Sequence, residues 1–156
     1  MLFLILLSFL SLRPSERTCE CPPAPTVEVA VQNSAAVFAG EVIAEDYRAV
    51  EKEESRVLVI RFKVKRWWKG TGAAEVELYT SVRKDADGNT VSLAADFRFK
   101  KGESYLVYAS VKDEKLSTSD CSRTRILVDA AEDLDQLGVG APQLVSGTRR
   151  ATQQPF

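Results

Sequence analysis

Three cysteines constrain this chain more than any other feature. Two of them stand one residue apart in Cys19-Glu20-Cys21, and the third, Cys121, lies about a hundred positions downstream. Side chains at positions i and i+2 of an extended segment point the same way, so Cys19 and Cys21 cannot bridge each other comfortably. Within the chain, either can pair only with Cys121, and the residues leave open which one does. Such a bridge would tie the N-terminal segment to the rest of the fold as a strap, and we expect function at or near this strap.

An apolar run at residues 1–12 precedes the strap and has the length of a signal-peptide hydrophobic region. The run is too short to cross a bilayer, and Arg13 and Pro14 end it. We therefore interpret residues 1–18 as a signal peptide of uncertain cleavage site, with a buried N-terminal strand as the alternative. We expect a secreted protein, or a periplasmic one if the chain is bacterial. Export would allow a disulfide, whereas three reduced cysteines remain the alternative for a reducing compartment.

Composition argues against several classes of function. The 156 residues carry a formal net charge of -1, which offers no basic surface for nucleic acid. The chain contains no histidine, the commonest general base and metal ligand, so an ordinary catalytic triad cannot form. Residues 85–89 resemble a fragment of a calcium loop, but the full pattern is missing and a plain hairpin turn is the better interpretation. We expect a non-enzymatic protein with no cofactor and no metal of its own.

Alternating apolar and polar positions predict a mainly β domain. Gly40 lies inside the first strand and indicates a bulge or bend of the kind that a small barrel needs at its corners. A helix over 129–137 is predicted to be capped by Asp129 and ended by Gly138. Arg123 and Arg125 are expected to pair with Glu132 or Asp133 of that helix. The predicted strands are residues 36–47, 56–69, 75–79, 104–111 and 116–119.

Five strands with short helical pieces describe a small closed or half-closed β-barrel, with a sandwich as the alternative. We place this domain at residues 19–138 and expect residues 139–156 to be a flexible tail, because they are small and polar without periodicity. Trp67 and Trp68 are adjacent on a strand, so one should point inward and the other outward. The outward one is a candidate surface anchor for a partner, although covering the edge of the barrel is the commoner role.

Five short motifs, taken in order along the chain, resemble the tissue inhibitor of metalloproteinases family, within the broader netrin-like modules. The resemblance is to short, single-domain members of bacterial type. It implies a five-stranded closed barrel of the oligonucleotide/oligosaccharide-binding (OB) type with one or two flanking short helices, secreted and non-enzymatic. It also favours a short helix over 27–36, where alternating valines alone would favour a strand. The motifs are Cys19-x-Cys21, 36–42 (AVFAGEV), 64–70 (VKRWWKG), 101–109 (KGESYLVYA) and 121–125 (CSRTR).

The resemblance also implies a disulfide map. In the family's pattern the second cysteine of the strap pairs with the cysteine that follows the Lys-Gly-Glu strand, which carries over to Cys21 and Cys121. The mate of the first cysteine is missing, because the matching position reads Ala94-Ala95-Asp96. Cys19 is then an odd thiol, free or bonded to another molecule in a disulfide-linked dimer or a tether to another exported protein.

By the same resemblance, the chain would act on a zinc metalloproteinase. The α-amine and carbonyl of Cys19, if it is the mature N-terminus, would ligate the catalytic zinc of the protease and displace its water. Glu20 would face the specificity pocket of the protease, and Cys21 would anchor the strap. The alternative is a secreted, disulfide-stapled protein-binding module without inhibitory activity.

Overall fold

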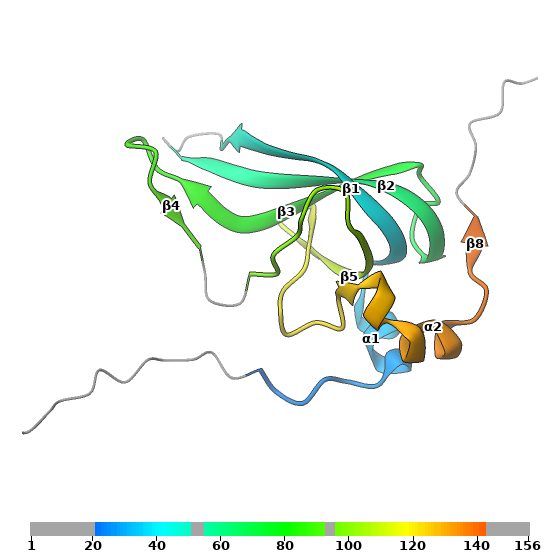
Figure 1. Ribbon diagram of the computed structural model, residues 1–156. Helices are drawn as coiled ribbons and strands as arrows, with labels where there is room; N and C mark the ends of the chain where they lie inside the picture. The colour runs from blue at the N-terminus through cyan, green and yellow to red at the C-terminus, as the bar shows by residue number, and fades with distance from the viewer. Residues whose placement is uncertain (1–20, 51–54, 93–95, 143–156) are drawn as a thin grey trace, which may run out of the picture.

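The computed structural model describes residues 21–50, 55–92 and 96–142, and within them the chain is mainly β, as predicted (Figure 1). The expected signal peptide, Cys19, Glu20 and the expected tail from residue 143 lie outside the described residues. All strand pairs are antiparallel, and the main path of the sheet runs β4-β3-β2-β1-β5-β6. The strands are β1 (Ala36–Ala49), β2 (Arg56–Lys69), β3 (Glu75–Lys84), β4 (Thr90–Val91), β5 (Ser104–Lys112), β6 (Lys115–Ser117), β7 (Arg125–Ile126) and β8 (Ala141–Pro142).

The two long strands, β1 and β2, form the centre of the sheet, and their apolar residues make the main core. Phe38 of β1 packs edge-on against Phe62 of β2, with ring centroids 5.4 Å apart, and both side chains are fully buried. Gly40 lies at the predicted bulge, where the register between β1 and β2 shifts. A Cβ at Gly40 would stand 3.1 Å from the carbonyl oxygen of Lys63, so the close approach of the two strands favours glycine.

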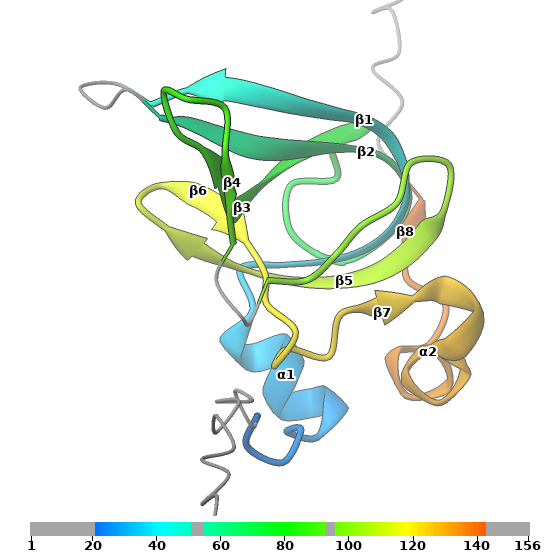
Figure 2. The same cartoon turned by 60° about the vertical axis from the view of Figure 1, so that its left-hand side comes forward.

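A second, smaller core lies on the outer face of the sheet, beneath two short helices (Figure 2). Helix α1 (Val27–Asn33) and helix α2 (Ala131–Leu137) cover Val37 of β1 and Leu106 and Tyr108 of β5. The first half of β1 is consequently buried on both faces. Tyr105 to Ala109 of β5 are also buried on both faces, which explains why that segment is apolar throughout.

Both helices were predicted, but the start of α2 differs from the prediction. Asp129 does not cap the helix: it lies in the 3-10 turn η1 (Leu127–Asp129), and the residue before α2 is Ala130, which makes no side-chain cap. Ala130 is fully buried in the second core, so packing rather than capping decides where α2 begins. Its end is at Gly138 as predicted, with φ +69°.

The sheet is not closed into a barrel, in contrast to the expected closed form. It curls until β6 lies opposite β3 (Figure 2), and the Lys115 Nζ stands 4.7 Å from the ring centre of Tyr79. No ladder joins β3 to β6 among the described residues. The C-terminal end of β3 pairs with β4 instead. Strand β6 has only three residues, which are too few to form a ladder along the whole length of β3. The gap between these strands holds a cleft.

The chain continues past α2 along the sheet. Ala141 and Pro142 pair with Trp67 and Arg66 of β2. The first four residues of the expected tail, 139–142, therefore run against the domain. In the described part of the chain, no helix is both long and apolar enough to cross a membrane.

Candidate functional site

The strap is joined to the domain by a disulfide between Cys21 and Cys121. Their Cα atoms are 5.2 Å apart and the two residues are separated by 100 positions. This is the pairing that the family resemblance implied, and the alternative bridge from Cys19 to Cys121 is not the one formed. Cys19 and Glu20, the other two residues predicted for the strap, lie outside the described residues.

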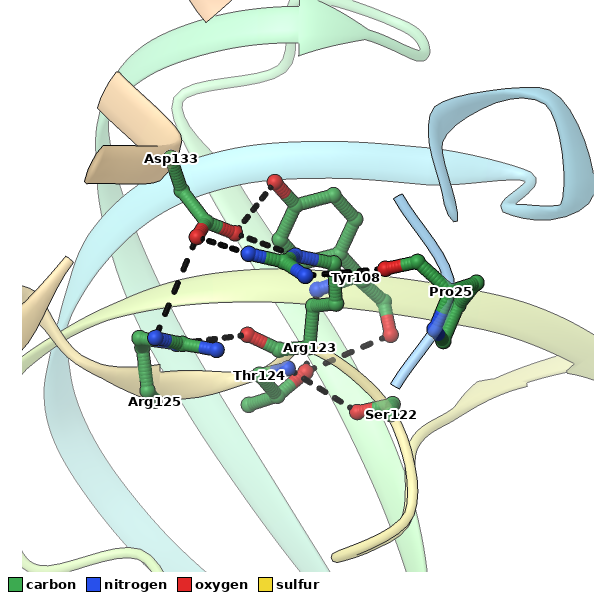
Figure 3. Close-up of polar contacts among 7 residues, drawn as sticks. All are labelled: Pro25, Tyr108, Ser122, Arg123, Thr124, Arg125 and Asp133. Atoms are coloured by element: carbon green, nitrogen blue, oxygen red, sulfur yellow. Dashed lines mark hydrogen bonds and ion pairs between the residues drawn. The ribbon is translucent and has the colours of Figure 1, made fainter. Parts of the chain in front are cut away.

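A second tie lies four residues further along the strap. The Arg123 Nη1 donates a hydrogen bond to the Pro25 carbonyl oxygen over 2.8 Å (Figure 3). Arg123 comes two residues after Cys121, so one short loop supplies both ties. The segment from Cys21 to Pro25 is thus held at each end.

Arg123 is itself held by a fully buried carboxylate. Asp133 is fully buried, and its oxygens accept hydrogen bonds from Arg123 Nε at 2.9 Å and Nη2 at 2.5 Å. Arg125 approaches the same carboxylate, with its Nη1 3.8 Å from Oδ1. The predicted pairing of these arginines with an acid of α2 is confirmed, and the acid is Asp133 rather than Glu132.

Tyr108 completes this buried cluster, and sequence reasoning did not single it out. Its hydroxyl donates to Asp133 Oδ2 over 2.9 Å. The burial of the Tyr108 hydroxyl, together with the neighbouring carboxylate, raises its pKa well above the usual range. Burial opposes ionisation of Asp133, but the hydrogen bonds from Arg123 and Tyr108 outweigh it and leave the pKa of Asp133 below its ordinary value. A tyrosine within an apolar strand carries no signal that would reveal a partner on a distant helix.

Three hydroxyl groups fix the loop that carries Cys121. Thr118 Oγ1 donates to the Tyr108 carbonyl oxygen over 2.9 Å and lies 2.9 Å from Ser122 Oγ. Thr124 Oγ1 accepts from the Tyr108 backbone N–H over 3.0 Å. The loop is therefore hydrogen-bonded to strand β5 on both sides of the disulfide.

The polar groups of this cluster are each engaged in a hydrogen bond, which indicates a structural role for them. The guanidinium, carboxylate, phenol and hydroxyl groups are hydrogen-bonded to one another and to the backbone. The residues of the strap from Cys21 to Ala24 are exposed. The arrangement is a clamp that presents a short, fixed, exposed segment of chain.

The two tryptophans predicted as a candidate surface anchor have structural positions. Trp67 is 4% exposed, lies in the main core and donates from Nε1 to the Ala73 carbonyl oxygen over 2.9 Å. Trp68 points to the opposite face, partly buried against the second core, and its Nε1 donates to the Gly138 carbonyl oxygen over 3.0 Å. The predicted in-and-out orientation is observed, and the outward ring covers the end of α2.

Within residues 21–50, 55–92 and 96–142, no group of three or more histidine, cysteine, aspartate or glutamate residues is placed to hold a metal ion. In comparisons with known proteins, the chain matches no family model and no curated protein.

Proposed function

We propose that the protein is a secreted, non-enzymatic binding module whose clamped N-terminal strap is its interaction surface. The observation that carries this proposal is the double tie of the strap, by the Cys21–Cys121 disulfide and by the hydrogen bond from Arg123 to Pro25. A segment held in this way loses little conformational entropy when it binds a partner. Pro22 and Pro23 stiffen it further, because a proline ring fixes φ.

The partner class that the family resemblance names is a zinc metalloproteinase. Cys19 is two residues from the anchored Cys21, so a chain that began at Cys19 would project its α-amine from a fixed point. That amine, together with the Cys19 carbonyl oxygen, would ligate the zinc of the protease in place of the attacking water. The curled sheet with a bulge at Gly40 and helices on its outer face supports a further proposal, that the domain is an opened variant of the OB-type barrel.

The first test is the intact mass of the exported protein under non-reducing conditions. A chain that starts at Cys19 and carries one internal disulfide would support the inhibitor mechanism. A chain that starts upstream of Cys19 would contradict zinc ligation by the Cys19 amine, and leave a binding module without that activity.

The second test measures inhibition of a zinc metalloproteinase on a fluorogenic peptide. Protein that begins at Cys19 is compared with the same protein carrying one additional alanine before Cys19. We expect inhibition only without the alanine, because acylation of the amine removes its lone pair for zinc. Equal inhibition by both forms, or by neither, would exclude the chelation mechanism. A Glu20→Ser variant should inhibit more strongly if the pocket of the protease is apolar, because a buried unpaired carboxylate is costly.

The cysteine count favours one alternative, a covalent assembly through Cys19. Cys21 and Cys121 are bonded to each other, and the chain has three cysteines, so Cys19 has no other cysteine of its own chain as a mate. We expect a disulfide-linked dimer, or a tether to another exported protein, on non-reducing electrophoresis if Cys19 is used in this way. Cys19→Ser should abolish that band, and a purely monomeric wild-type protein would rule the dimer out.

A further inference from the structure

The open seam between β3 and β6 holds a cleft of about 650 Å³. Its walls come from the end of β3, the β5–β6 hairpin and the end of α1, which are distant in sequence. The volume lies within the range of sites for small organic ligands, roughly 300–1,000 Å³. Pro25 of the strap and Ser122 and Arg123 of the loop that carries Cys121 also contribute to its wall, whereas the exposed residues from Cys21 to Ala24 do not.

Two exposed lysines of the cleft lie at the base of the β5–β6 turn, and the Nζ of one of them, Lys115, lies 4.7 Å from the Tyr79 ring centre. Lys112 of β5 and Lys115 of β6 are directly opposite each other in the antiparallel register, and both line the cleft. Like charges in directly opposed positions destabilise a strand pair. Neither lysine forms an ion pair within the part of the chain that the structure describes. The turn between them is also strained, because Asp113 and Glu114 have positive φ angles of 49° and 61° without being glycine.

The rest of the lining is mixed in character. The Tyr79 ring and the buried Val57 give it an apolar part, and serine hydroxyls such as those of Ser110 and Ser117 give it a polar part. Asp113 is the acid nearest the two lysines in sequence. The other lining carboxylate, Asp96, accepts hydrogen bonds from the Ser81 backbone and the Ser92 hydroxyl, so its charge is engaged on the β3 side of the cleft.

We propose that this cleft binds a small amphipathic anion, with its acid group between Lys112 and Lys115, beside the Tyr79 ring, and its apolar body against Val57. A carboxylate or sulfonate there would balance the charge of the two lysines and cover apolar surface at the open seam. This site goes beyond the proposed role of the strap and does not depend on it.

The test is a fluorescence titration of the full chain with 8-anilinonaphthalene-1-sulfonate, which is an aromatic anion. We expect saturable binding of one molecule per chain with a blue-shifted emission. The variant with Lys112→Glu and Lys115→Glu should bind roughly tenfold more weakly or worse, since it loses the charge-assisted contacts to the sulfonate and adds like charges. Lys101→Glu, a charge reversal on the exposed turn before β5, is the matched control and should bind as the wild type does.

A second arm uses competition and filling of the cleft. Decanoate should displace the fluorescent probe at much lower concentration than decanol, which has the same chain without the charge. Ser110→Trp should reduce binding by placing a large ring in the cleft, and far-UV circular dichroism checks that each variant is folded. If the double charge reversal does not fold, Lys112→Gln and Ser110→Trp decide the matter.

The proposal is overturned if the folded wild type shows no saturable binding. It is also overturned if the lysine variants bind as tightly as Lys101→Glu, or if decanol competes as well as decanoate. None of these readouts involves a protease or Cys19, so they are independent of the fate of the proposed function.

Discussion

Arg123 and Asp133 lie ten positions apart, and their ion pair connects helix α2 to the N-terminal strap. Asp133 is fully buried and accepts two hydrogen bonds from the guanidinium, whose remaining Nη1 donates to the Pro25 carbonyl oxygen. One arginine thus joins an acid of the last helix to the chain that precedes the first helix. Removing either partner should affect both the stability of the domain and the position of the strap.

The first prediction concerns Asp133→Asn. This change leaves Arg123, whose side chain is 11% exposed, without its counter-charge. Removing one charged partner of a buried ion pair costs about 3–5 kcal/mol, so the free energy of unfolding should fall by that amount. Urea unfolding followed by tryptophan fluorescence measures it. Asp135→Asn, at an exposed position of the same helix, is the control and should change stability by less than about 0.5 kcal/mol.

The second prediction concerns acid. The pKa of Asp133 in the folded protein lies below its ordinary value of 3.8, so the unfolded chain binds a proton here more readily. The stabilisation is therefore complete above about pH 4 and is lost as the pH falls through the folded pKa. The triple variant Tyr108→Phe, Arg123→Met, Asp133→Leu has no carboxyl at this place and should lack this part of the acid dependence.

The acid prediction is checked by urea midpoints measured between about pH 6 and pH 2. Replacement of a buried charged cluster by apolar groups of similar size is often neutral, so the triple variant should remain folded at neutral pH. Parallel curves for the wild type and the triple variant below pH 4 would contradict the assigned role of Asp133.

The third prediction concerns the disulfide. Loss of a bridge that closes a loop of 100 positions should cost about 4–5 kcal/mol in the chain-entropy description. Cys121→Ser should show this loss in urea unfolding, and wild-type protein in reductant should approach the same value. Cys19→Ser should leave the stability of the monomer unchanged. A large effect of Cys19→Ser in the monomer would mean that the internal bridge involves Cys19 instead.

The fourth prediction compares two glycines that both have positive φ. At Gly70, with φ +126°, a Cβ would stand 2.4 Å from the Trp67 Cζ3 atom. At Gly88, with φ +84°, an added Cβ would have no other atom within 4 Å. Gly88→Ala should cost only the backbone term, about 1–2 kcal/mol. Gly70→Ala should cost a further 1–3 kcal/mol because Trp67 must shift in the core. Equal thermal unfolding temperatures would refute the role of this contact.

Much of the local structure follows from local sequence. Apolar residues that alternate along 56–69 produce a strand with one buried side, and Gly40 produces the bulge, because both depend on neighbouring residues and strand geometry. Gly138 ends the last helix for the same kind of reason, since glycine adopts a positive φ without steric cost. The cysteine count limited the disulfide to two pairings, and the family resemblance indicated the one that is found.

The tertiary structure decided what depends on residues far apart in the chain. Asp129 was expected to cap α2, but burial of Ala130 against β5 sets the start of the helix. The sheet was expected to close, yet the three-residue β6 does not pair with β3, and the seam between them remains a cleft. Strand propensity is a local property, whereas closure depends on the sum of twist, bulges and strand lengths around the whole sheet. The hydrogen bond between Tyr108 and Asp133 could not be predicted from local sequence either, because only tertiary packing brings β5 and α2 together.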